Sequence, residues 1–86
     1  MNETITTFQF RKGFEVIHEM EGTFTQARKK GDELANEHGR VEMSAHNPST
    51  NRWESLTTFL GNRQAINCFG QPCIIDPDYR NMWTKE

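Results

Sequence analysis

Alternation of apolar and polar positions near the N-terminus predicts a β-hairpin. Residues 4–10 are rich in β-branched and aromatic side chains, and Phe8 and Phe10 alternate with polar neighbours. This period of two is typical of a half-buried strand. Gly13 allows the positive φ of a tight turn, after which residues 14–20 alternate again. We interpret residues 14–20 as the second strand. A short helix there is the alternative, because the apolar residues of this segment also fit helical spacing.

After the hairpin, the apolar period changes to that of an α-helix over residues 24–38. Apolar or small residues recur three or four positions apart, at Phe24, Ala27, Gly31, Leu34 and His38. Thr23 and Gln26 have the spacing of a capping box, and Gly39 stands where a C-terminal glycine belongs. Glycine within a helix costs about 1 kcal/mol relative to alanine, so Gly31 predicts a close approach of helix and sheet. We expect the opposite face to be solvated: Arg28, Lys29, Asp32, Glu33 and Glu37.

A second hairpin is predicted after the helix. Residues 40–46 alternate, residues 47–51 are dense in turn-forming side chains, and residues 52–60 form the return strand. Capping-box spacing leaves a helix over 52–60 as an alternative, but the β-branched and aromatic run at 57–59 favours a strand. Residues 64–69 are interpreted as a last short strand.

The C-terminal residues predict a short helix that carries three large side chains. Asp76 is the N-cap, Pro77 is the first helical residue, and Tyr79, Met82 and Trp83 then share one face. The predicted fold class is α+β: a small antiparallel sheet of about four strands in ββαββ order, one main helix on one face of the sheet, and a short C-terminal helical turn. The 86 residues form one domain over 1–86.

Composition suggests a soluble chain with a small core. Only 34% of the residues are hydrophobic and the mean hydropathy is −0.85, yet six Phe, two Trp and one Tyr argue against disorder. No apolar run approaches the length of a membrane span, and the first ten residues lack the layout of a signal peptide. Two cysteines without an export signal predict reduced thiols and a cytoplasmic location.

The charge balance does not indicate a nucleic-acid partner. The net charge is −2, whereas nucleic-acid-binding domains usually carry a basic excess. A small nucleic-acid-binding domain stays as an alternative function, and its candidate contacts are the two basic clusters, Arg11, Lys12, Arg28, Lys29 and Lys30.

A metal site is the second alternative. Cys68 and Cys73 are spaced C-x4-C, and His38 or His46 would have to complete the ligand set. Zinc prefers four ligands from two closely spaced pairs, and the second pair is missing here. We therefore expect no metal and no other cofactor. The sequence contains no phosphate-binding loop, H-E-x-x-H or dinucleotide-binding motif, so we do not expect an enzyme.

The aromatic residues at the C-terminus are the strongest indication of function. Tyrosine and tryptophan are favoured at protein interfaces, and the candidate partner-binding residues are Tyr79, Met82, Trp83 and Trp53. The alternative is that the C-terminal aromatics cover the core of their own chain. We expect a non-enzymatic protein-binding accessory module. Short, polar, motif-free chains of this size are often accessory proteins of phages or mobile elements that bind a host protein, and inhibition of that host protein is one form this activity could take. The partner is a protein of unknown identity, and a homodimer is the other form of association considered.

Overall fold

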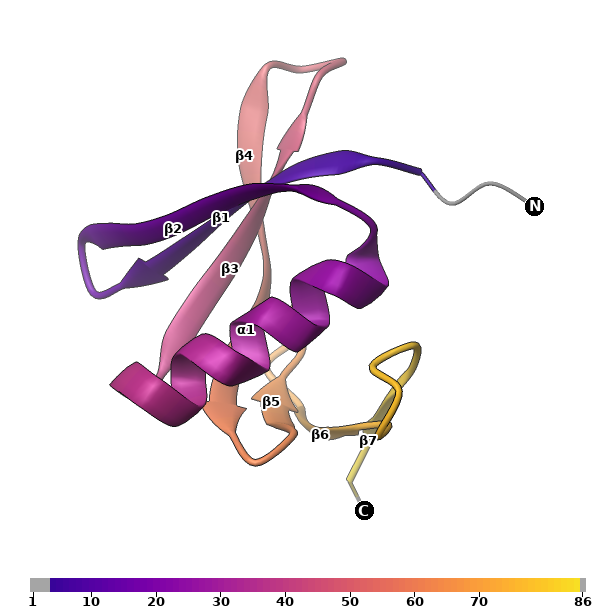
Figure 1. Ribbon diagram of the computed structural model, residues 1–86. Coiled ribbons are helices and arrows are strands. Elements are labelled where there is room, and N and C mark those ends of the chain that lie inside the picture. The colour runs from indigo at the N-terminus through magenta and orange to yellow at the C-terminus, as the bar shows by residue number, and fades with distance from the viewer. Residues whose placement is uncertain (1–3, 86) are drawn as a thin grey trace.

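A computed structural model describes residues 4–85 and places one helix against seven strands in that part of the chain (Figure 1). The helix α1 spans Phe24–His38. The strands are β1 (Thr6–Lys12), β2 (Glu15–Gly22), β3 (Val41–Asn47), β4 (Arg52–Gly61), β5 (Gln64–Ile66), β6 (Pro72–Ile75) and β7 (Met82–Thr84). They form one sheet in the order β2-β1-β3-β4-β5-β6-β7, and all neighbours are antiparallel.

The predicted α+β class is confirmed, but the predicted sheet of about four strands is wrong. The long strands β1 to β4 lie close to their expected positions, including the strands preferred over helices at 14–20 and 52–60. The sheet then continues through β5, β6 and β7, so the order of elements is longer than ββαββ. These last strands have only three or four residues each, which is too few to show a clear period of two.

The predicted C-terminal helical turn is also wrong. Tyr79 has a φ of 62°, which a right-handed helix does not tolerate. The backbone N–H of Tyr79 donates to Asp76 O at 2.9 Å, and that of Asp76 donates to Asn81 O at 3.0 Å. The segment is therefore a turn, and it returns the chain so that β7 pairs with β6. A proline after an aspartate opens turns as well as helices, and here the turn forms.

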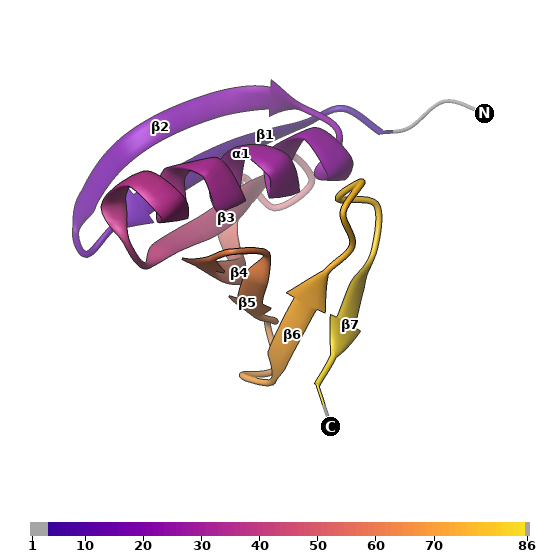
Figure 2. The ribbon, with the colours of Figure 1, turned by 60° about the horizontal axis from the view of Figure 1, so that its bottom comes forward.

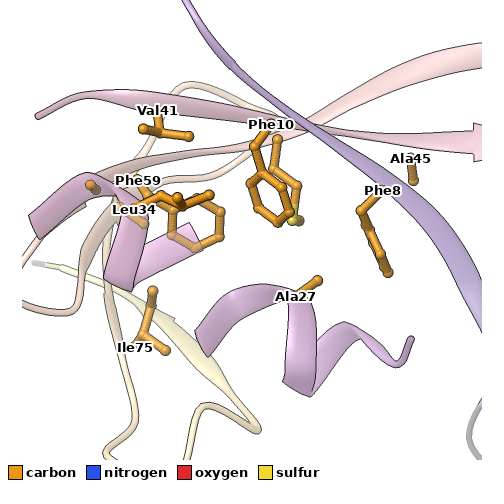
Figure 3. Close-up of a cluster of buried hydrophobic side chains, with 11 residues drawn as sticks. Phe8, Phe10, Ala27, Leu34, Val41, Ala45, Phe59 and Ile75 are labelled. Carbon is orange, nitrogen blue, oxygen red and sulfur yellow. The ribbon is translucent and has the colours of Figure 1, made fainter. Parts of the chain in front are cut away.

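The core lies between α1 and the inner face of the sheet (Figure 3). Phe8, Phe10 and Phe59 are fully buried there. A side chain at Gly31 would collide with the ring of Phe59, so the predicted close approach of helix and sheet is confirmed. The helix meets β4 there without a Cβ to separate them.

Both ends of α1 are capped as the sequence predicts. The Thr23 hydroxyl accepts from Gln26 N at 3.2 Å, and the Gln26 side chain accepts from Thr23 N at 2.9 Å. Gly39 follows the helix with a φ of 84°, and its N–H donates to Ala35 O at 2.8 Å. The helix is therefore fixed in length by local chemistry.

The sheet curls around the helix. Figure 2 shows β2 along one side of α1, while β6 and β7 turn away from the first three strands on the other side. The turn between β6 and β7 thereby comes to lie next to the helix, where Arg28 reaches it.

Candidate functional site

The C-terminal candidates Tyr79, Met82 and Trp83 do not share one surface. Tyr79 and Met82 pack against the hydrophobic core. Trp83 follows Met82 in β7 and points to the opposite face of the sheet, where 60% of its surface is exposed. The core-covering alternative considered from the sequence therefore holds for Tyr79 and Met82, and the partner-binding alternative stays a prediction for Trp83. Tyr79 and Met82 cover the core, and Trp83 is available at the surface.

Asp32 connects the helix to two turns. One carboxylate oxygen accepts from Arg63 N at 2.8 Å, and the other accepts from the Tyr79 hydroxyl at 2.9 Å. Arg28, one helical turn earlier, donates to Tyr79 O at 3.2 Å and to Arg80 O at 3.0 Å. We call Arg28, Asp32, Arg63 and Tyr79 the helix clamp. It fixes the turns before β5 and before β7 to α1.

The prediction that Asp32 is solvated is wrong, since only 2% of its surface is exposed. A buried carboxylate needs hydrogen-bond donors, and its donors here come from 31 and 47 residues further along the chain. Helical periodicity carries no information about hydrogen-bond partners that are so far away in the sequence. The sequence does place Asp32 next to the apolar stripe of the helix. Aspartates that are exposed to solvent occur in the same sequence position, so this placement does not predict burial.

Burial raises the pKa of the Tyr79 hydroxyl above its usual value. The hydrogen bond to Asp32 and the negative charge of that carboxylate act in the same direction, while the charge of Arg63 opposes them. Neutral Tyr79 is therefore the form that fits the helix clamp. The hydroxyl acts as a structural donor to Asp32.

The outer face of the last strands carries exposed apolar side chains. Ile74 and Trp83 are directly opposite each other in β6 and β7, and they are 45% and 60% exposed. Leu60 lies between Phe59 and Gly61, which both face the helix, so alternation directs it to the same outer side. We call Leu60, Ile74 and Trp83 the C-terminal apolar face. Gln64, opposite Ile74 in β5, accepts from Lys85 Nζ at 3.1 Å and lies between Ile74 and β4. The indole N–H of Trp83 donates to Asp76 at 2.7 Å, which orients the ring.

The turn between β5 and β6 presents Phe69, which is 83% exposed. The side-chain oxygen of Asn67 accepts from Phe69 N at 2.9 Å and from Gln71 N at 3.0 Å. The backbone closes the same turn, with Asn67 N donating to Gln71 O and Gly70 N to Asn67 O, both at 3.0 Å. Phe69 is therefore displayed by a hydrogen-bonded turn. Sequence reasoning did not single out Phe69, although an Asn-Cys-Phe-Gly run does contain a turn signal.

Trp53 lies away from the other partner-binding candidates. It is opposite His46 near the β3–β4 turn, and the centres of the two rings are 5.3 Å apart. His46 also contacts Asn51 at 3.0 Å. β5 pairs with β4 only from Thr58 onward, so Trp53 is at the other end of β4 from the C-terminal apolar face.

The five basic candidates for nucleic-acid binding point in several directions. Arg28 belongs to the helix clamp. Lys29 and Lys30 line a groove on the other side of the helix, next to β2. Arg11 contacts Gln9 on the sheet at 3.1 Å, and Lys12 lies near the end of the helix at Gly39. These side chains do not form one basic stripe.

The metal-binding candidates are also dispersed. Cys68 is exposed in the β5–β6 turn, whereas Cys73 is buried in β6 and its thiol donates to Gln71 O at 3.4 Å. His38 is at the end of α1 beside Glu37, and His46 is beside Trp53. Within residues 4–85, no three His, Cys, Asp or Glu side chains converge in a way that could hold a metal ion.

Comparisons with known proteins leave the site to be judged on its own geometry. No family model, curated protein or solved structure matches this chain. The fold defines a class of protein, in which a single helix packs against a curled antiparallel sheet. The described part of the chain contains no helix that is both long and apolar enough to span a bilayer.

Proposed function

We propose that this chain is a non-enzymatic protein-binding module that docks through the C-terminal apolar face. The observation that carries the proposal is the pair Ile74 and Trp83, which are opposite each other and exposed on adjacent strands. Exposed apolar clusters on small proteins commonly mark interaction sites. Tryptophan at the centre of an interface is the residue type most often responsible for a large share of the binding energy.

Preorganisation supports the same proposal. The hydrogen bond to Asp76 orients the side chain of Trp83. Side chains that are already ordered lose less conformational entropy when a partner binds. The helix clamp adds to this, because it fixes the turn from which β7 begins. We propose that the partner that binds the C-terminal apolar face is another protein, and that binding inhibits this partner.

The experiment compares Trp83→Ala with Trp53→Ala. Both remove a partly exposed tryptophan from the sheet, but Trp53 lies outside the C-terminal apolar face. Partners should be captured from a host lysate on the wild-type chain, identified by mass spectrometry, and then measured individually in purified form. We expect Trp83→Ala to weaken the purified complex by about 2 kcal/mol or more, and Trp53→Ala to leave it unchanged.

Sedimentation of the free chain separates a partner protein from a second copy. If the wild type is a dimer and Trp83→Ala is a monomer, the occupant of the C-terminal apolar face is a second copy of this chain and not a partner protein. A monomeric chain whose Trp83→Ala variant binds the purified partner with wild-type affinity would contradict the proposed face.

A further inference from the structure

The strand β2 has one edge that no described residue pairs with. It is the last strand on its side of the sheet, and its other edge pairs with β1 from Thr6 to Lys12. It contains eight residues, which corresponds to roughly 26 Å of extended backbone. The unpaired N–H and C=O groups of such an edge can form a ladder with an extended peptide.

A groove runs between this edge strand and the helix. It has a volume of about 350 Å³, and its lining residues are His18, Met20, Glu21, Gln26, Lys29, Lys30 and Glu33. Its lining residues on β2 fall between His18 and Glu21, and those on α1 between Gln26 and Glu33, so the groove follows the second half of the strand. In Figure 1 the strand and the helix diverge away from their connection. A segment that paired with β2 would therefore send every second side chain into this groove and the others to the outer face of the sheet.

The charges along the edge determine which segment fits. In the pairing with β1, Glu19 is opposite Gln9 and Glu21 is opposite Thr7, and Arg11 donates to the Gln9 side chain at 3.1 Å. Neither forms an ion pair with any residue between 4 and 85. Within the groove, Lys30 is already 4.0 Å from Glu33. Toward an incoming strand, the edge strand thus presents two carboxylates that form no ion pair within the described residues, whereas the charges of the groove lining are balanced, with Lys29 and Lys30 against Glu21 and Glu33.

A second copy of this chain does not fit the same edge. If two β2 strands paired antiparallel with their outer faces aligned, Glu19 and Glu21 of one copy would be opposite or diagonal to Glu19 and Glu21 of the other. Like charges in those positions destabilise a pair of strands. The carboxylates that disfavour self-pairing favour lysine or arginine on a different strand.

We propose that the groove between β2 and α1 binds an extended basic segment of a partner protein, which adds to the sheet next to β2. Its outward side chains are Lys or Arg beside Glu19, and its inward side chains are apolar and contact Met20 in the groove. This site is separate from the C-terminal apolar face, and it does not depend on the function proposed for that face.

The probe is a capped heptapeptide in which lysine alternates with valine, added to the isotope-labelled full chain. We expect its amide shift changes in NMR spectra to be concentrated in Glu15–Gly22 and in the helix residues that line the groove. The same peptide with glutamate in place of lysine should not bind. A peptide with proline in place of the central valine keeps its charge but loses a ladder donor and fits a strand poorly, so it should bind about tenfold more weakly.

Matched variants test the role of charge. Glu19→Gln with Glu21→Gln should weaken peptide binding between about twofold and about thirtyfold, the range expected for two exposed ion pairs. Glu42→Gln with Glu54→Gln makes the same change in net charge on β3 and β4, and it should leave the affinity unchanged. Equal weakening by both double variants, shift changes away from β2, or undiminished binding of the proline peptide would each overturn the proposal. Concentration-dependent shifts of β2 amides without peptide would also overturn it, because they would identify a second copy as the occupant.

Discussion

The two halves of the sheet are held to the helix in different ways. The strands β1, β3 and β4 pack large apolar side chains under α1, with Phe8, Phe10 and Phe59 fully buried. The strands β5 to β7 are short, and hydrogen bonds of Asp32 and Arg28 connect the adjacent turns to the helix. Apolar packing therefore contributes to both halves, since Ala65 and Ile75 are also buried in the core, and the second half has specific polar contacts to the helix in addition. The second half also keeps large apolar side chains exposed.

The largest effect is expected where the helix contacts β4. Gly31→Leu should lower the free energy of unfolding by about 3 kcal/mol, because the added side chain collides with the buried ring of Phe59. Gly31→Ala should be destabilising by a smaller amount, since its Cβ meets the same ring and outweighs the gain in helix propensity of about 1 kcal/mol. Denaturant unfolding measures both, and a higher melting temperature for either variant would contradict the close approach.

The next effect is expected in the helix clamp. Asp32→Ala removes the acceptor for Arg63 N and the Tyr79 hydroxyl, so we expect a loss of about 2 kcal/mol in the free energy of unfolding. Glu33→Ala is the matched control, because it removes an exposed carboxylate from the neighbouring position of the same helix. Denaturant melts of the two variants should differ clearly. Equal stabilities would show that Asp32 contributes little to attaching the second half.

A smaller effect is expected for the hydroxyl of Tyr79. Tyr79→Phe should lower the unfolding free energy by about 1 kcal/mol at neutral pH, because it removes one hydrogen bond to Asp32. The folded pKa of Tyr79 is raised, so the stability contributed by its neutral form is fully present below about pH 10, the usual pKa, and is lost as the pH rises through the folded value. The difference in unfolding free energy between the wild type and Tyr79→Phe should therefore disappear at high pH.

Tyr79 is the single tyrosine of the chain, so its ionisation can be followed directly by absorbance near 295 nm. We expect the pKa of Tyr79 to be higher in the folded wild type than in the unfolded chain, and Asp32→Asn to shift this pKa toward its usual value. A folded chain that titrates like the unfolded one would contradict the contact between Tyr79 and Asp32.

The smallest effect on stability is expected for the exposed Trp83. Its ring is 60% exposed, so Trp83→Ala should change the free energy of unfolding by no more than about 0.5 kcal/mol. A thermal melt beside the binding measurement separates folding from docking. A loss of several kcal/mol would assign Trp83 to the fold and would remove the basis for the C-terminal apolar face.

The same contrast explains which elements could be predicted from the sequence. The helix, its caps and the strands up to β4 have long periodic patterns and local signals, such as Thr23 with Gln26. β6 and β7 are short and are arranged by a turn with positive φ at Tyr79, which is not a residue usually expected there. Asp32 was assigned to solvent because its partners are remote in sequence. Trp83 was identified as a candidate from its type and position. Its location on the face of the sheet opposite Met82 could not be predicted, because the segment was expected to be a helix and is a strand.

Native-state hydrogen exchange of the wild type and Asp32→Ala tests most directly whether polar contacts hold the second half in place. The amides of Ile75, Asp76 and Lys85 donate to backbone acceptors within the C-terminal strands and turns, so they report on that half, while the amides of β1 and β3 report on the first. We predict that Asp32→Ala accelerates exchange at Ile75, Asp76 and Lys85 by a larger factor than in β1 and β3. Equal acceleration throughout the sheet would show that both halves unfold as one unit, which would contradict this description.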